Sequence, residues 1–249
     1  MNPQTLTEQL KRLRLLTAAA ELESVLNKRK AAAEVTWAVE LLERELDARR
    51  EKAFKARIKA ARFPEVTSLE SFDWKFNPEI DELKIKELAK LNFVKENQIA
   101  LFLGKPGTGK THLALAIGIR AASQGTRVYC TSVKRLVHDI RVAKLKNNLD
   151  VLFRKILSSQ LWILDDWGVI SMDRESAEEV FDLLDRRKHS SAMILTSNRD
   201  VAEWAEVFPE PVLASAAVDR IFDRAEIVLF NGNSYRMKGK INFRSRPSE

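Results

Sequence analysis

The sequence predicts an α/β protein with a five-stranded parallel sheet, preceded by a small all-helical domain. Two observations support this fold class. From residue 79 onward, five short apolar runs alternate with amphipathic stretches of helical period. Before residue 64, the chain contains no glycine, and its only proline is Pro3. We therefore assign residues 1–63 to the helical domain, 64–78 to a linker that packs onto the following domain, and 79–249 to the α/β domain.

Three helices are expected in the helical domain. The run Thr5-Leu6-Thr7-Glu8 fits a capping box in front of a first helix. A second helix is expected near residues 17–30, and a third could begin at Thr36 and reach about Arg62. Phe63-Pro64 should end that helix, because the residue before a proline disfavours the helical conformation.

The five strands are expected at the apolar runs of the α/β domain. They are Ile99–Leu103, Arg127–Thr131, Leu161–Leu164, Ala192–Thr196 and Glu226–Phe230. These runs are far too short to span a bilayer, and the chain opens without a secretory signal pattern. The lone Cys130 excludes an intramolecular disulfide and a multi-cysteine zinc site. We therefore expect a soluble, cytoplasmic protein with no membrane partner.

The net charge of +7 is unevenly distributed. Residues 1–62 carry +5, residues 127–155 carry +6 and the tail, residues 236–249, carries +4, so that the remainder carries −8. On a helix, four cations of the first segment would form one stripe without an acid: Lys52, Lys55, Lys59 and Arg62. Like charges at this spacing repel one another, so the stripe favours contact with a polyanion such as DNA over a solvated helix face, which remains the alternative.

A phosphate-binding loop follows the first expected strand. The run Gly104-Lys105-Pro106-Gly107-Thr108-Gly109-Lys110-Thr111 matches the pattern G-x-x-x-x-G-K-[ST], and a helix is expected to begin at His112. Glycines let backbone N–H groups converge on phosphate oxygens, and the helix N-terminus adds partial positive charge. Lys110 would bind the β- and γ-phosphates, and Thr111 would offer its hydroxyl to Mg²⁺. This nucleotide-binding set extends through His112.

Two further strands end in polar residues. Asp165 and Asp166 follow the run Leu161–Leu164; in nucleoside triphosphatases, the first acid at such a position holds Mg²⁺ and the second can orient or deprotonate water. Asn198 follows the next strand and could position that water if this strand lies beside the strand that precedes the phosphate loop. The alternatives are an acidic turn and an asparagine that caps a turn.

Two arginines, Arg220 and Arg224, lie near the end of the last expected helix. They are either surface arginines paired with Asp219 and Asp223, or they include an arginine finger for the γ-phosphate of a neighbouring subunit.

Four motifs in this order resemble the IstB/DnaC group of AAA+ ATPases, and most closely IstB. They are Gly-Thr-Gly-Lys-Thr-His112, Asp165-Asp166-Trp-Gly168, Thr196-Ser197-Asn198 and Asp219-Arg220-Ile-Phe-Asp-Arg224-Ala-Glu226. The resemblance implies a P-loop NTPase sheet with strand order 5-1-4-3-2, no C-terminal lid domain, and a homo-oligomer with ATP at its subunit interfaces. It makes Arg220 the trans-acting finger, with Arg224 as second choice.

The resemblance also implies a function. Residues 132–159 match a basic helical insert that contacts DNA, with Lys134, Arg135, Lys144 and Lys146 as the expected contacts. The implied protein is a Mg²⁺-dependent bacterial ATPase that oligomerises on duplex DNA and recruits or stimulates a transposase. Two alternatives remain open. One is a DnaC-type helicase loader. The other is an ATP-gated DNA scaffold with negligible turnover, because Asp166 stands where many AAA+ proteins have Glu.

Overall fold

The computed structural model describes residues 3–29, 36–188 and 190–238. The chain divides into two compact units, one ending at Ala56 and one beginning at Arg57. This division falls inside helix α3 (Thr36–Ala61), whereas the sequence places the domain boundary after residue 63. No helix in the described residues is long and apolar enough to cross a membrane.

The first unit is helical. It contains α1 (Pro3–Arg12), α2 (Leu16–Arg29) and most of α3, and Leu6, Leu10, Ala19 and Val39 form its small apolar core. The predicted capping box is wrong, because α1 already begins at Pro3 and Thr5 lies inside it. Proline is well tolerated in the first turn, where its missing N–H has no intrahelical partner anyway.

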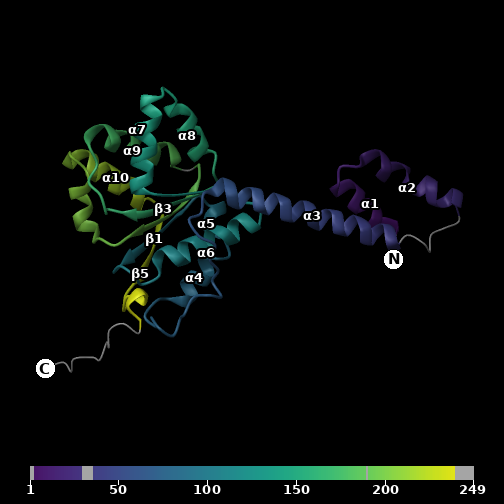
Figure 1. Cartoon of the computed structure of the whole chain (residues 1–249), viewed down its shortest axis with the longest axis horizontal. Coiled ribbons are helices and arrows are strands. Elements are labelled where there is room, and N and C mark those ends of the chain that lie inside the picture. Colours follow the sequence, from purple (N-terminus) through teal and green to yellow (C-terminus); the bar gives the residue numbers. More distant parts are fainter. Residues whose placement is uncertain (1–2, 30–35, 189, 239–249) are drawn as a thin grey trace. The chain divides into compact units, whose positions relative to one another are not determined.

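The second unit is an α/β sandwich (Figure 1). Its elements are α4 (Glu82–Leu88), α5 (Asn92–Lys95), β1 (Ile99–Gly104), α6 (Lys110–Ser123), β2 (Val128–Ser132), α7 (Val133–Leu145), α8 (Leu149–Leu157), β3 (Leu161–Trp167), α9 (Arg174–Arg187), β4 (Ala192–Ser197), η1 (Val201–Val207), α10 (Pro211–Phe222), β5 (Ala225–Phe230) and η2 (Tyr235–Met237). One face of the sheet packs against α4, α5 and α6, and the other against α7 to α10.

The sheet confirms the predicted topology. All strand pairs are parallel and the order is β2-β3-β4-β1-β5, which read from the other side is 5-1-4-3-2. This is the strand order that the resemblance to AAA+ P-loop proteins implies. Because β4 lies between β1 and β3, the segments that leave the carboxyl ends of these three strands emerge side by side. This placement brings the phosphate loop, the paired aspartates and Asn198 to one edge of the sheet.

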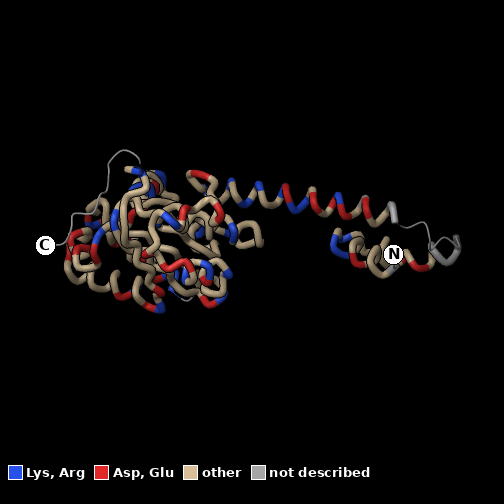
Figure 2. The backbone as a smooth tube through the Cα atoms, turned by 90° about the horizontal axis from the view of Figure 1, so that it is seen from below, with Lys and Arg blue, Asp and Glu red and all other residues tan. Residues whose placement is uncertain are grey.

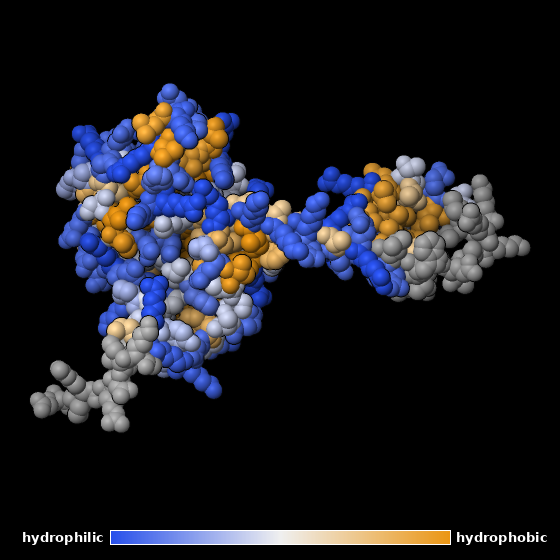
Figure 3. All heavy atoms as spheres, viewed as in Figure 1, coloured by the Kyte–Doolittle hydropathy of each residue, from blue (hydrophilic) through white to orange (hydrophobic). Residues whose placement is uncertain are grey.

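The segment 132–159 forms a structural layer of the sandwich. Helix α7 buries Leu136 and Ile140, and α8 buries Phe153 and Ile156, all within the apolar core beneath the sheet. Its outer surface is mixed: Figure 3 shows apolar groups over α7 and α8, where Leu145 is 86% exposed. The basic side chains of this segment therefore lie on helices that the fold itself requires.

Candidate functional site

The phosphate loop is enclosed by two flanking chain segments. Gly107 and Gly109 adopt positive φ angles of 79° and 106°. A Cβ atom at Gly107 would lie 2.1 Å from Ser234 Oγ, and one at Gly109 would lie 2.4 Å from the Phe72 ring. Glycine is thus required both for the backbone curl and for the close approach of the segments around Phe72 and Ser234.

Lys110 is folded back onto its own loop. Its Nζ donates to the carbonyls of Gly104 (2.7 Å) and Lys105 (2.6 Å), and the side chain is buried. Burial lowers the pKa of Lys110 to about 8, although Asp165 and Asp166 favour the charged form. The ammonium is therefore held at the loop by weak neutral acceptors that a phosphate can replace.

Asp165 collects two hydroxyl donors at one oxygen. Its Oδ1 accepts from Thr111 Oγ1 at 2.8 Å and from Thr196 Oγ1 at 2.5 Å. The Thr111 hydroxyl and the Asp165 carboxylate are hard oxygen ligands, brought together from α6 and β3, and they fit Mg²⁺, which uses few protein ligands alongside phosphate oxygens. Thr196 belongs to the motif Thr196-Ser197-Asn198, but its bond to Asp165 was not predicted, because the motif does not show which strand Thr196 contacts.

Asp166 occupies a strained backbone position. Its φ is 60°, in the left-handed region, and the pairing of β3 with β4 is irregular between Leu164 and Trp167. The Asp166 N–H donates to Thr196 Oγ1 (3.1 Å), and its Oδ1 accepts from Asn198 Nδ2 (3.3 Å). Burial and the neighbouring Asp165 charge raise the pKa of Asp166. The structure thus brings the two acids and Asn198 together beside Lys110.

These groups share a pocket of about 300 Å³. Its lining comprises Glu65, Pro106, Gly107, Gly109, Lys110, Thr111, His112, Asp165, Asp166, Asn198, Tyr235 and Arg236. Glu65, Tyr235 and Arg236 were not predicted. The charge of Arg236 acts on both Lys110 and Asp166, lowering the pKa of each. By charge, Arg236 belongs to the basic tail of residues 236–249, and no sequence motif predicts an arginine that senses ATP from within the chain. The position of Arg236 in this pocket supplies a candidate.

Asn77 ties the flanking segments to the loop. Its side-chain amide donates to the carbonyl oxygens of Asn233 (3.0 Å) and Thr108 (3.4 Å), and its Oδ1 accepts from the Asn233 N–H (3.0 Å). Tyr235 N–H also donates to the Gly107 carbonyl at 2.8 Å. The side chain of Asn77 is buried, so these bonds fix the loop against the segment that carries Tyr235 and Arg236.

The remaining loop residues have structural partners. His112 Nε2 contacts the Ser68 carbonyl (3.1 Å) and Ser71 Oγ (3.2 Å), and its ring lies against Phe72. Thr108 Oγ1 donates to the Lys105 carbonyl at 2.8 Å. The segment 64–78 thus packs directly on the phosphate loop and forms one wall of the site.

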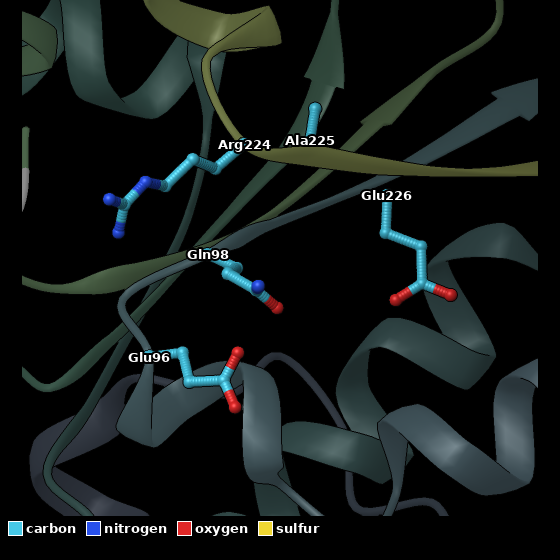
Figure 4. Close-up of a pocket in the computed structure, with 5 residues that line it drawn as sticks. All are labelled: Glu96, Gln98, Arg224, Ala225 and Glu226. Atoms are coloured by element: carbon cyan, nitrogen blue, oxygen red, sulfur yellow. The ribbon is translucent and has the colours of Figure 1, made fainter.

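Arg220 and Arg224 lie at the opposite edge of the sheet. Arg220 lies in the last turn of α10 and donates to Asp185 (2.6 Å) and Asp219 (2.8 Å), whereas the Arg224 carbonyl accepts from Ile99 N–H, at the amino end of β1. Figure 4 shows Arg224 at a surface hollow there, its side chain pointing away from Glu226. The length of β1, about 17–20 Å, separates this edge from the phosphate loop of the same chain.

The expected DNA contacts differ in their surroundings. Arg62 is not part of the predicted helical stripe: α3 ends at Ala61, the φ of Arg62 is 63°, and Nη1 binds Asp139 (2.8 Å) and Tyr129 (3.0 Å). The Asp139 bond raises the pKa of Arg62. The stripe is also less purely basic than predicted, because Glu51 pairs with Lys55 at 2.5 Å, and Figure 2 shows acids and bases interspersed along α3.

Two cations of the predicted stripe, Lys52 and Lys59, are exposed. In the 132–159 segment, Lys134, Arg135 and Lys146 are exposed as well. Lys144, by contrast, is held by Glu175 (2.8 Å) and Glu179 (2.7 Å), which raise its pKa. Its charge is thus already compensated within the chain.

Comparison with known proteins shows which family has a sequence similar to this chain. Residues 5–242 match the family model of the IstB-like ATP-binding proteins. An ATP-binding protein of insertion sequence IS21 from Pseudomonas aeruginosa is 40% identical over 199 residues, which cover 80% of this chain and 75% of the relative. One of insertion sequence IS232 from Bacillus thuringiensis subsp. berliner is 34% identical over 237 residues, covering 94% and 95%.

Solved structures agree in fold. The crystal structure of DnaI superposes with a TM-score of 0.57 at 22% identity and covers 70% of this chain and 93% of that one. AMPPCP-bound DnaA from Aquifex aeolicus gives 0.56 at 22%, covering 74% and 58%. At these identities the likeness extends to the AAA+ fold alone. The family match over nearly the whole chain and the curated relatives agree with the four sequence motifs: the chain belongs to the family of IstB-like ATP-binding proteins of insertion sequences.

Proposed function

We propose that this protein hydrolyses ATP in a Mg²⁺-dependent reaction at the pocket around Lys110, Asp165 and Asp166. One observation carries the proposal: the Thr111 hydroxyl lies 2.8 Å from Asp165 in a pocket that also contains Lys110, Asp166 and Asn198. Thr111 and Asp165 would hold Mg²⁺, which would offset charge on the phosphate oxygens. Lys110 would bind the β- and γ-phosphates, with loop N–H groups from 104–112 around them.

Asp166 and Asn198 would activate and position the attacking water. The raised pKa of Asp166 makes its carboxylate a better proton acceptor than a solvated aspartate. Asn198, hydrogen-bonded to that carboxylate, would hold the water in line. Arg236 would contact the phosphates from within the chain, because its charge already reaches Lys110 and Asp166.

A second subunit would complete this site. Arg220 lies at the edge of the sheet opposite the phosphate loop, so it can act only on the ATP of a neighbour. A side-by-side homo-oligomer with ATP at each interface follows, and Arg224 is the alternative finger. Arg220 would exchange the Asp185 carboxylate for a phosphate on assembly.

We further propose that the oligomer forms on duplex DNA in the bacterial cytoplasm and recruits or stimulates a transposase. The curated relatives are ATP-binding proteins of insertion sequences, which supports transposition over helicase loading. The exposed cations that the sequence predicted as DNA contacts support this proposal: Lys52 and Lys59 of α3, and Lys134, Arg135 and Lys146 of the 132–159 segment. Residues 1–63 would then serve as a DNA-contacting arm, and 79–249 as the ATPase.

The direct test measures ATP hydrolysis by the full chain with and without duplex DNA. We expect stimulation by DNA, loss of ATP binding in Lys110→Ala, and retained binding with at least 100-fold slower hydrolysis in Asp166→Asn. No hydrolysis by the wild type in either condition, even at high protein concentration, would refute the enzyme. If Asp166→Asn leaves DNA assembly, its release and transposase stimulation unchanged, ATP acts as an assembly ligand instead.

A further inference from the structure

Three basic side chains converge on a pocket far from the ATP site. Arg57, Arg127 and Lys155 line a hollow of about 150 Å³, together with Ala60, Val128, Tyr129, Ser158 and Ser159. Arg127 directly precedes β2, and Ser159 precedes β3. The hollow therefore lies at the amino ends of these strands, beside the edge strand β2, whereas the phosphate loop lies at the carboxyl end of β1.

Both arginines are anchored through the same atom. Arg57 Nε donates to the Ala122 carbonyl at 2.7 Å, and Arg127 Nε donates to the Ser158 carbonyl at 2.9 Å. An arginine fixed at Nε keeps its two terminal nitrogens available, and these can donate side by side to two oxygens of one phosphate. Anchoring also removes much of the side-chain entropy that binding would otherwise cost.

The pocket has no acid of its own. None of its lining residues is Asp or Glu, and the nearby Asp139 is bound by Arg62 at 2.8 Å. Lys155 lies over the Tyr129 ring, with its Nζ 5.9 Å from the ring centroid. Three cations without a carboxylate repel one another, so an anion that enters gains from all three. The volume equals that of about five water molecules, which is sufficient for a phosphate group.

We infer that this pocket binds one backbone phosphate of duplex DNA, with Arg57, Arg127 and Lys155 as its ligands. The inference deepens the proposed function and rests on its DNA-binding part. A phosphate at this position would fix the register of the DNA on the ATPase unit without reading its sequence. The contact would differ from those of exposed lysines because its donors are positioned before the DNA arrives.

The test compares two neighbouring residues of α8. Lys155 lines the pocket, whereas Arg154 lines a different hollow, with Asp150 and Arg186. The full-length variants Arg127→Gln/Lys155→Gln and Arg154→Gln are titrated against labelled duplexes of unrelated sequence at several salt concentrations. Lys155→Gln alone is a second pocket variant, because this exposed side chain can be replaced without disturbing the core. Binding of a fluorescent ATP analogue verifies that each variant is folded.

We expect the double variant to bind every duplex about tenfold more weakly, with the slope of log K against log salt lower by about 1. Arg154→Gln should keep the wild-type slope. An unchanged slope in both pocket variants, with ATP binding intact, would overturn the phosphate site while leaving the proposed function standing. A wild type that binds ATP but no duplex DNA would contradict both the phosphate site and the DNA-binding part of the proposed function. A loss confined to one duplex sequence would also overturn the inference, because a backbone phosphate carries no sequence.

Discussion

The two edges of the parallel sheet are built differently. At the carboxyl edge, the charged groups are buried or half-buried and hydrogen-bonded to neutral partners: Lys110 to loop carbonyls, Asp165 to two hydroxyls and Asp166 to the Asn198 amide. At the amino edge, Arg220 forms surface ion pairs, and Arg224 lies beside a hollow. The first arrangement can hold a nucleotide by itself, and the second presents cations outward. The difference fits the proposal that the first edge receives ATP and that the second acts on a neighbouring subunit.

The largest effect is expected when the outward-facing cation Arg220 is removed. Arg220→Ala should lower ATP hydrolysis by about 10³-fold under assembling conditions, because an arginine finger contributes at least that much. ATP affinity of the unassembled chain should not change, since Arg220 is remote from its own pocket. Steady-state hydrolysis and nucleotide titration measure the two effects. Equal losses in both would place Arg220 in the pocket of its own chain.

The carboxyl edge has an arginine of its own, Arg236, which lines the ATP pocket. Arg236→Ala should weaken ATP binding about tenfold and ADP binding much less, because a guanidinium close to Lys110 and Asp166 would contact the terminal phosphate. Competitive titration with both nucleotides measures the ratio. The matched control is Lys238→Ala, which removes a nearby cation that pairs with Asp73 at 2.6 Å. Equal weakening of ATP and ADP would contradict this role.

Replacing Asn77 tests whether ATP binding at the carboxyl edge depends on the hydrogen bonds that join the phosphate loop to the segment around Asn233. Asn77→Ala removes three hydrogen bonds in a buried place and should lower the free energy of unfolding by about 2 kcal/mol. If Asn77 also positions Arg236, adding Asn77→Ala to Arg236→Ala should weaken ATP binding little further. Thermal unfolding and a double-mutant cycle on ATP affinity check both. Fully additive losses would reduce Asn77 to a purely structural residue.

The smallest expected effect is a pH dependence of ATP binding. The pKa of Lys110 is lowered to about 8, and bound phosphates favour its charged form, so the bound pKa is higher. Affinity should therefore be level below about pH 8 and fall as pH rises above it, with uptake of a proton on binding. Calorimetry in buffers of different ionisation enthalpy measures that proton. Affinity that stays level up to pH 9.5 would contradict the shift.

The sequence predicted the core of the fold and of the candidate site because both depend on local patterns. The strands appear as apolar runs, and the phosphate loop as a contiguous motif after the first of them. Thr196, Asn77 and Arg236 escaped because their roles come from tertiary contact. Asn77 meets Asn233 across 156 positions of the chain. The charge count assigned Arg236 to a basic tail, but the neighbouring Tyr235 is hydrogen-bonded to Gly107, and Arg236 therefore lines the pocket of the phosphate loop.

Charge patterns were the least reliable guide. The helical stripe assumed that α3 continues through Arg62, but the left-handed conformation of Arg62 turns its side chain to Asp139. The prediction of the stripe also left out Glu51, which lies one turn before Lys55 and forms an ion pair with it. By contrast, Arg57 and Arg127 lie 70 positions apart and share a pocket that no spacing rule could have indicated.

In the proposed assembly, the amino edge of one subunit completes the ATP site at the carboxyl edge of the next. Mixing Lys110→Ala, which keeps the finger, with Arg220→Ala, which keeps the pocket, tests it most directly. Each variant alone should be inactive on DNA. In an equal mixture, about one interface in four pairs an intact pocket with an intact finger, so hydrolysis should return to about a quarter of the wild-type rate. A mixture as inactive as its components, with co-assembly on DNA verified, would contradict the claim.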